Sequence, residues 1–259
     1  MSSAARQIAA IARLTVWESL SPRFVLLLAA LLAAAFAVAL FAGELAVTET
    51  RAVQTALLAA ALRLGAVLLL GLWLISAVVR EADDQVLAFL FALPLSRGAY
   101  CLGRLLGGAV VGLLVALPAG LVLLPFAPAP AVGLWAASLT LELWLTAAVA
   151  LALGLAFLQI TPAFIALLAF YLLGRALAAI ELMAHSGLME GGGWTRQVVV
   201  HLVDALALVL PDLSAYGRSE WLVYPGAGDS GMGALLTQTV LYLLLLGGVA
   251  VFDLYRKNF

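Results

Sequence analysis

Three ionisable side chains stand inside long runs of apolar residues, where a charge needs a partner. Glu142 lies near the middle of its run, Arg175 in the second half of the next run, and Arg63 in the first half of an earlier one. A charge at the centre of a bilayer helix costs about 2.5 to 3.5 kcal/mol, so it faces an opposite charge or a water-filled path. Two interpretations follow: an ion pair within one subunit, or contact with a transported substrate. Arg63 could instead extend its charge to the membrane surface.

A second set of residues fits the pattern of an intramembrane serine protease. Residues 228–231 read Gly-Asp-Ser-Gly, which places Ser230 just before an apolar run. Such a serine needs a base, for which a histidine from another span would serve. The two histidines, His185 and His201, both lie outside the apolar runs. The protease therefore stays an alternative function with Ser230 as its nucleophile, beside the simpler interpretation of a glycine-rich turn before a helix.

Residues that can bind a metal gather in one part of the chain. They are Met183, His185, Met189, His201 and Asp204. Only His201 and Asp204, three residues apart, have a spacing that brings two ligands together on one helix face. A polar helix face explains this pair without a metal, so we assign no metal site.

The composition predicts what holds these residues in place. Of the 259 residues, 66% are hydrophobic and 10% are charged, and the mean hydropathy is +1.17. A soluble domain has about one quarter charged residues, so we expect an all-α polytopic membrane protein. The net charge of -1 and thirteen dispersed basic residues give no reason to expect a nucleic-acid partner. A single cysteine, Cys101, excludes an intrachain disulfide.

Six apolar runs are each long enough to cross a membrane. A hydrocarbon core of about 30 Å requires about 20 residues at the helical rise of about 1.5 Å. An even number of crossings leaves both termini on one side, and we treat residues 1–259 as a single transmembrane domain. The predicted spans are residues 24–42, 56–79, 99–124, 131–158, 162–183 and 232–252.

The basic residues predict the orientation of these spans. One set of loops and chain ends carries Arg6, Arg13, Arg23, Arg80, Arg97, Arg104, Arg256 and Lys257, and the other carries Arg51, Arg196 and Arg218. Because basic loops stay in the cytoplasm, we expect both termini to be cytoplasmic. The expected location is a plasma membrane of the bacterial type, the inner membrane.

A helix is predicted before the first span, over residues 4–20. Arg6 and Arg13 share one face of it and apolar residues occupy another, which is typical of a helix at a membrane surface. Glu18 falls near the apolar face and interrupts the pattern. A signal peptide would be the alternative, but the apolar run that follows is too long for one.

Small residues recur every four positions in the third predicted span. They are Gly108, Gly112, Ala116 and Gly120. Such a stripe lets another helix approach closely, although chance can produce it in a chain rich in glycine and alanine.

The segment between the fifth and sixth predicted spans, residues 184–231, is too long to be a simple turn. Within it, residues 195–210 place Gln197, His201 and Asp204 on one face of a helix and apolar residues on the rest. This pattern predicts a re-entrant or amphipathic helix at the outer membrane surface.

The stretch after the second predicted span favours a short amphipathic helix on the cytoplasmic side. Asp83 and Asp84 lie in its expected first turn, where the helix dipole favours carboxylates. Leu87, Leu90 and Pro94 fall three and four residues apart and form one apolar face. The alternative is a loop that merely joins two spans.

Several short motifs along the chain point to the same protein family. They are Arg80-Glu81, Leu87 to Leu90, Ala92-Leu93-Pro94-Leu95-Ser96-Arg97, Gly103-Arg104, Leu210-Pro211-Asp212-Leu213 and the ending Tyr255-Arg256-Lys257-Asn258-Phe259. On these motifs the chain resembles an ABC-2 type permease, the membrane subunit of an ATP-binding-cassette exporter. Gln85-Val86 stands where the first cytoplasmic loop of that family commonly has Gly-Thr.

The resemblance implies that residues 81–97 form a coupling helix that docks into a separate ATPase subunit. The docking residues would be Glu81, Asp83, Asp84, Leu87, Leu90, Pro94 and Arg97. The chain contains no G-x-x-x-x-G-K-[ST] motif, so ATP and Mg are expected on the partner, with no cofactor and no enzymatic activity in this chain.

The resemblance also implies how such a protein works and assembles. Two permease copies, as a homodimer or with a related permease, would move a substrate by alternating access. The chain is also similar to permeases linked to multi-copper enzyme maturation. The expected partners include membrane lipids and periplasmic accessory proteins. An ATPase-independent secondary transporter is a further alternative, for which Pro118 and Pro162 would supply the helix breaks.

Overall fold

A computed structural model describes residues 3–45, 50–92, 96–185, 200–206, 210–217, 222 and 231–256. Every regular element in these ranges is helical, as the composition predicted. The elements are α1 (Ser3–Ser19), α2 (Pro22–Leu45), α3 (Thr50–Asp83), α4 (Val86–Ala92), α5 (Arg97–Leu123), α6 (Ala129–Phe157), α7 (Ile160–His185), the 3-10 turn η1 (Ala215–Gly217) and α10 (Met232–Arg256). Residues 200–206 are also helical.

Six of these helices are long and apolar enough to cross a membrane: α2, α3, α5, α6, α7 and α10. Each coincides with one predicted span, and the ends differ by only a few residues. The prediction of six helices that are long and apolar enough to cross a membrane is therefore confirmed. With 34 residues, α3 is the longest. At about 1.5 Å per residue it exceeds a hydrocarbon core of about 30 Å and must extend beyond it.

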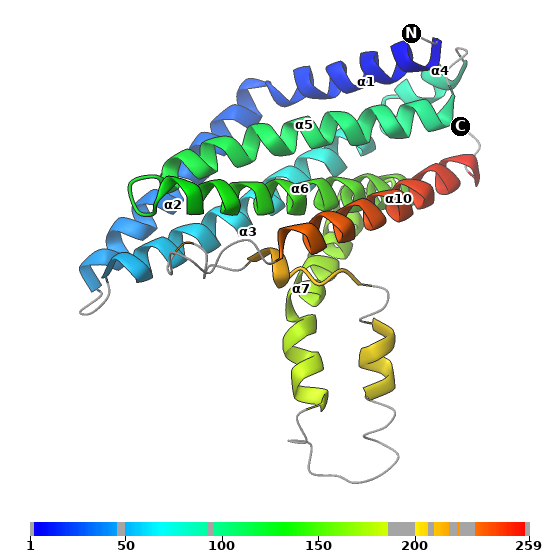
Figure 1. Cartoon of the computed structure of the whole chain (residues 1–259). Helices are drawn as coiled ribbons and strands as arrows, with labels where there is room; N and C mark the ends of the chain where they lie inside the picture. The colour runs from blue at the N-terminus through cyan, green and yellow to red at the C-terminus, as the bar shows by residue number, and fades with distance from the viewer. Residues whose placement is uncertain are drawn as a thin grey trace.

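The helices form an elongated bundle with α6 at its centre (Figure 1). The apolar window of α6 is 83% buried, whereas that of α10 is 17% buried, so α6 is enclosed by its neighbours and α10 lies at the edge. The distal part of α7 and the helix at 200–206 project away from the bundle (Figure 1). Both termini and α4 lie at one end of the bundle, which we call the terminal end (Figure 1).

The small-residue stripe of α5 packs against α6. A β-carbon added at Gly108, Gly112 or Gly120 would lie 3.2 to 3.3 Å from a β-carbon of α6, closer than ordinary van der Waals contact. Ala116, the fourth member of the stripe, is buried. The prediction that this stripe allows close helix approach is therefore confirmed, and α6 is the helix that approaches.

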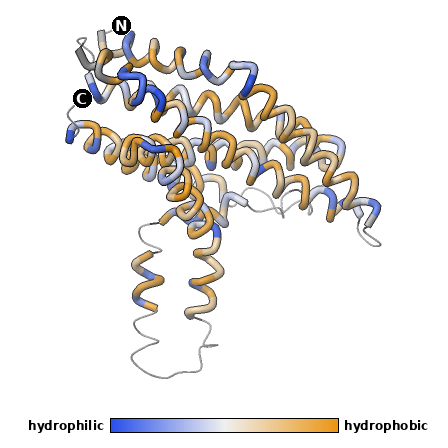
Figure 2. Tube along the Cα trace, turned by 180° about the vertical axis from the view of Figure 1, so that it is seen from behind, coloured by the Kyte–Doolittle hydropathy of each residue, from blue (hydrophilic) through white to orange (hydrophobic). Residues whose placement is uncertain are grey.

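The predicted N-terminal helix is present as α1, and it packs along α5. A β-carbon added at Gly103 would lie 2.6 Å from the β-carbon of Ile11, and one added at Gly107 would lie 2.5 Å from that of Thr15. These two glycines therefore form the surface on which α1 lies. Figure 2 shows that hydrophilic residues gather toward the ends of the bundle and are sparse along its middle.

Candidate functional site

The three ionisable residues of the apolar runs meet in one buried cluster, which we call the central cluster. The carboxylate of Glu142 on α6 is fully buried, and Arg63 on α3 is 3% exposed. Arg63 Nη1 donates a hydrogen bond to Glu142 Oε2. Arg175 on α7, 33% exposed, places its Nη1 3.9 Å from Glu142 Oε1. Both arginines that the sequence offered as partners thus contact Glu142, and Arg63 does so at closer range.

Further side chains complete the hydrogen bonding of this cluster. Tyr171 donates its hydroxyl proton to Glu142 Oε1 at 3.0 Å, and Arg63 Nη2 donates to Ser138 Oγ at 3.0 Å. The Arg63 guanidinium also lies 5.2 Å from the ring centre of Trp135. Sequence reasoning did not name Tyr171, Ser138 or Trp135. Helical spacing could have found them, because each lies four or seven residues from a charged member and so on the same face.

The central cluster lies close to the middle of the bundle. Gly65 on α3 lies against Leu31, which is near the midpoint of α2. Arg63 is about 3 Å from that level along α3, at about 1.5 Å per residue. The alternative in which Arg63 extends to the membrane surface is therefore wrong. The side chain is held inside because Glu142, buried on the neighbouring helix, needs an opposite charge.

Residues 210–217 lie against Arg175 of the central cluster. The backbone N–H of Leu213 donates to the carbonyl of Gly174 at 3.2 Å, and Arg175 Nη1 donates to the carbonyl of Leu213 at 3.3 Å. The hydroxyl of Tyr216 lies 2.8 Å from Thr239 Oγ1 on α10. Burial raises the pKa of Tyr216 to about 12. The segment that contains the Leu-Pro-Asp-Leu motif thus connects α7 to α10 and helps to position Arg175.

A second ion cluster, the terminal cluster, joins α1, α3 and α5. Arg104 on α5 is 1% exposed and forms ion pairs with Glu18 of α1, at 2.8 Å, and with Glu81 of α3. Arg104 Nη1 also donates to Thr15 Oγ1 at 3.1 Å, and Tyr100 donates to Glu81 Oε2 at 2.6 Å. The irregular position of Glu18 on its helix is explained by this contact. Glu81, predicted to dock an ATPase, is engaged inside the chain.

The turn between α3 and α4 differs from the prediction. Asp83 is the last residue of α3, and Asp84 lies in the turn, so neither stands in the first turn of the short helix. The helical hydrogen bonds of α3 continue until the N–H of Asp84 donates to the carbonyl of Arg80 at 2.9 Å. Gln85 then takes a left-handed conformation with φ 57°, and α4 begins at Val86. The short helix therefore begins after the two aspartates, which were expected in its first turn.

The face of α4 that points outward also differs from the prediction. Leu87 is fully buried and Leu90 packs against the core, so these two leucines hold α4 onto the bundle. The outward apolar side chains are Val86 and Phe89, and Phe89 is 69% exposed. Sequence periodicity found the two faces but could not tell which one faces the bundle.

Arg97, one of the predicted docking residues, contacts the C-terminal helix α10 within this chain. Its Nη1 donates to the carbonyl of Leu254 on α10 at 2.6 Å, and its guanidinium lies 5.4 Å from the ring centre of Tyr255. Pro94, the remaining docking residue, lies outside the described residues.

The described residues include only some of those that a metal site or a serine protease would need. His201 and Asp204 lie on the exposed helix at 200–206. Across the described ranges, no three His, Cys, Asp or Glu side chains are grouped so that they could hold a metal ion. Ser230, Met189 and Gln197 lie outside those ranges, as does the side chain of His185.

Comparison with known protein families finds none that matches this chain. Comparison with curated proteins likewise finds no similar sequence.

Proposed function

We propose that this chain is the membrane permease of an ABC-2 type exporter, driven by a separate ATPase subunit that binds ATP and Mg. The observation that carries the proposal is the α3–α5 connection at the terminal end (Figure 1). There, Gln85 joins α3 to α4 in a left-handed conformation that glycine adopts readily. Glycine is the common residue at this position in the family that the sequence resembles. The backbone therefore supports the resemblance at the position where the motif departs from it.

The docking surface of this proposal is the outward face of α4. Phe89 and Val86 supply its apolar part, and the exposed Asp83 and Asp84 supply its polar edge. Burying a phenylalanine side chain is worth about 1.5 to 3 kcal/mol, which corresponds to about 10- to 150-fold in affinity. The buried Leu87 holds α4 in place, so a force on Phe89 would be transmitted to the bundle.

Force from the ATPase would travel along α3 to the central cluster. Glu81 and Arg63 both belong to this one helix, which contains no proline, and they are separated by about 27 Å at about 1.5 Å per residue. At the terminal end, Glu81 couples α3 to α5 and α1 through Arg104. A rigid shift of α3 would move Arg63 relative to Glu142.

The central cluster contains two arginines, so Glu142 could pair with either Arg63 or Arg175. Arg175 already lies 3.9 Å from Glu142 and is partly exposed, so it could replace Arg63 as the closer partner when α3 moves. Glu142 would then keep an opposite charge in both states of an alternating-access cycle. In this proposal the permease acts as a homodimer in the plasma membrane with cytoplasmic termini, and accessory proteins can bind on the opposite, periplasmic side.

The test is affinity purification of the tagged chain from its native membrane in mild detergent, with identification of the proteins that accompany it. We expect an ATPase subunit that contains a G-x-x-x-x-G-K-[ST] motif, and ATP turnover only in the complex. Phe89→Asp should reduce its recovery at least about 10-fold. Trp17→Asp is the matched control, because Trp17 on α1 is also 69% exposed.

Two results would contradict the proposal. One is ATP turnover or transport by this chain without a partner. The other is the absence of any co-purified ATPase from a preparation in which the chain is folded. Equal loss of the ATPase in the Phe89 and Trp17 variants would show that α4 is not the specific contact.

A further inference from the structure

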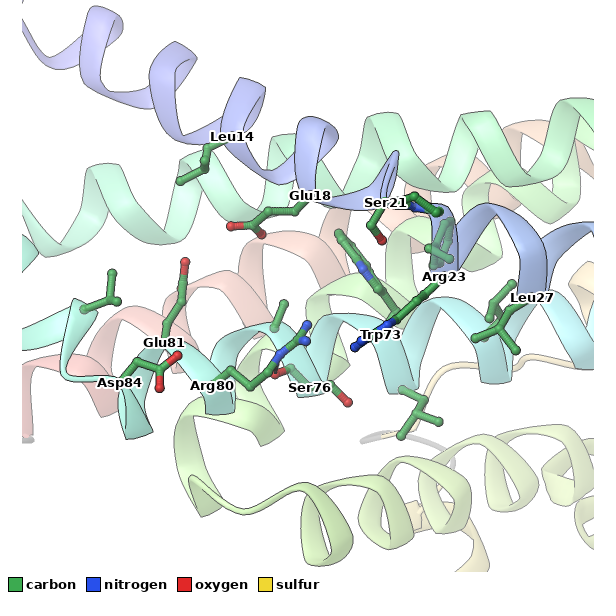
Figure 3. A pocket seen from close by; sticks show the side chains of 16 residues that line it. Leu14, Glu18, Ser21, Arg23, Leu27, Trp73, Ser76, Arg80, Glu81 and Asp84 are labelled. Atoms are coloured by element: carbon green, nitrogen blue, oxygen red, sulfur yellow. Dashed lines mark hydrogen bonds between the residues drawn. The ribbon is translucent and has the colours of Figure 1, made fainter.

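A large cavity opens between α1, the start of α2, and the terminal half of α3 (Figure 3). Its volume is about 850 Å³. We call it the α1–α3 cavity. It is separate from the central cluster, but its wall includes Glu18 and Glu81 of the terminal cluster and Asp84 and Val86 of the α4 surface.

The lining of this cavity changes in character along α3. From the terminal end inward it passes from Asp84 through Arg80 and Ser76 to Trp73 and finally to Leu69. These positions span about 22 Å of helix at about 1.5 Å per residue. The cavity is therefore polar and charged at one end and apolar at the other.

Two arginines converge in the polar part. Arg23, one residue into α2, and Arg80 point toward one another across the cavity, with Ser76 between them (Figure 3). Arg80 Nε donates to the carbonyl of Ser76 at 3.1 Å, which holds this side chain along α3. Among the described residues, no carboxylate forms an ion pair with Arg23 or Arg80.

The acidic residues of the lining form no ion pair with either of these arginines. Glu18 and Glu81 are both engaged by the buried Arg104. Asp84 lies at the α4 end of the cavity, on the far side of Arg80 from Arg23 (Figure 3). The two guanidinium groups can therefore bind an anion at the point where Arg23 and Arg80 face each other (Figure 3).

The backbone positions of the two arginines lie on either side of the boundary between the hydrocarbon region and the lipid headgroups. Taking the Leu31–Gly65 contact as the middle of the membrane, the backbone of Arg23 lies about 12 Å from it and that of Arg80 about 22 Å. The hydrocarbon boundary lies about 15 Å from the middle. Leu72 is about 10 Å from the middle, and so within the hydrocarbon region.

We propose that the α1–α3 cavity binds an anionic phospholipid from the leaflet on the side of the termini. Its phosphate lies between Arg23 and Arg80, since guanidinium groups recognise phosphate through paired hydrogen bonds. An acyl chain follows the apolar wall formed by Leu27, Leu69 and Leu72. A soluble anion would bind the two guanidinium groups but would make no contact with this apolar wall. The site does not depend on the transport function proposed above.

Trp73 provides a direct reporter of occupancy, because it lines the cavity beside the arginines. The chain is reconstituted into bilayers that contain phosphatidylglycerol or phosphatidylcholine with brominated acyl chains, which quench tryptophan fluorescence on contact. Subtracting the signal of a Trp73→Phe variant isolates the Trp73 contribution. We expect the brominated phosphatidylglycerol to quench Trp73 at a lower mole fraction than the brominated phosphatidylcholine.

The arginines should account for that preference. Arg23→Gln and Arg80→Gln are each expected to reduce it about fivefold, since one basic residue near an anionic surface is worth about 1 kcal/mol. Arg13→Gln is the matched control, because Arg13 is an exposed arginine of α1 that does not line the cavity. It should leave the preference unchanged.

Four results would overturn the proposal. The first is equal quenching by the two lipids in the parent protein. The second is an undiminished preference in the Arg23→Gln, Arg80→Gln double variant, with its unfolding temperature unchanged. The third is loss of the preference on addition of inorganic phosphate, which would identify a soluble anion as the occupant. An equal effect of Arg13→Gln would also refute it, since bulk surface charge would then be responsible.

Discussion

Neutralising Glu142 should destabilise the protein strongly unless Arg63 is neutralised with it. In the parent, Arg63 is 3% exposed and Glu142 is fully buried, so neither charge can reach water when its partner is removed. Among the described residues, Glu142→Leu leaves Arg63 with a hydrogen bond to Ser138 and a cation–π contact with Trp135. Arg63→Met leaves Glu142 with Tyr171 and the more distant Arg175.

The expected magnitude follows from the cost of one uncompensated charge near the membrane centre, about 2.5 to 3.5 kcal/mol. For a chain of this size that corresponds to a fall of roughly 5 to 14 °C in unfolding temperature. Arg63→Met should cost less than Glu142→Leu, because Arg175 can move closer to Glu142. The double variant should lie within about 1 kcal/mol of the parent, since an apolar pair can replace a buried ion pair.

Cys101 allows the measurement to be made without adding a label site. It is the single cysteine and is fully buried on α5, so a thiol-reactive dye reports its exposure when the protein unfolds in detergent. The unfolding temperature of the parent, both single variants and the double variant gives the coupling between the two residues. Arg51→Met is the matched control, because Arg51 is an exposed arginine in the first turn of the same helix, α3.

The reasoning would be refuted by additive effects. If the double variant is as unstable as the sum of the two single variants, Arg63 and Glu142 do not stabilise each other. A Glu142→Leu variant that unfolds at the same temperature as the parent would show that Glu142 needs no opposite charge.

Three other variants test separate features of the fold. Gly107→Val should detach α1 and expose it to limited proteolysis, because the β-carbon of the new side chain would lie 2.5 Å from that of Thr15. Gly133→Ala is the control that should have no effect, because no atom lies within 4 Å of a β-carbon added there. Gln85→Gly should raise the unfolding temperature by about 2 to 4 °C, by relieving about 1 kcal/mol of left-handed strain. Because the pKa of Tyr216 is raised from 10.0 to about 12, its neutral form stabilises the fold below pH 10, and this contribution is lost as the pH rises through about 12. Tyr216→Phe should remove that loss, as measured by tryptophan fluorescence during thermal unfolding.

The sequence alone was sufficient to predict the number, type and approximate limits of the membrane helices. A run of about 20 apolar residues has few alternatives, because in lipid every backbone polar group must be satisfied within the segment or in a closed barrel. The stripe from Gly108 to Gly120 could be identified for the same local reason, since its four-residue spacing is a property of one helix. The need of Glu142 for a partner also followed from its position within a span.

The tertiary structure decided which partners these elements have. Arg63 and Arg175 were equally available in the sequence, but Arg63 is the buried partner because of how far α3 is rotated and shifted along α6. The rotation and depth of the helices also determine that Glu18 pairs with Arg104 and that Arg23 faces Arg80. They likewise determine that Leu87 points into the bundle and Phe89 away from it. Helical periodicity defines the faces of each helix, whereas the depth and rotation that bring two faces together depend on contacts with all the other helices. Those contacts join residues far apart in the chain, which is why no local pattern could have predicted them.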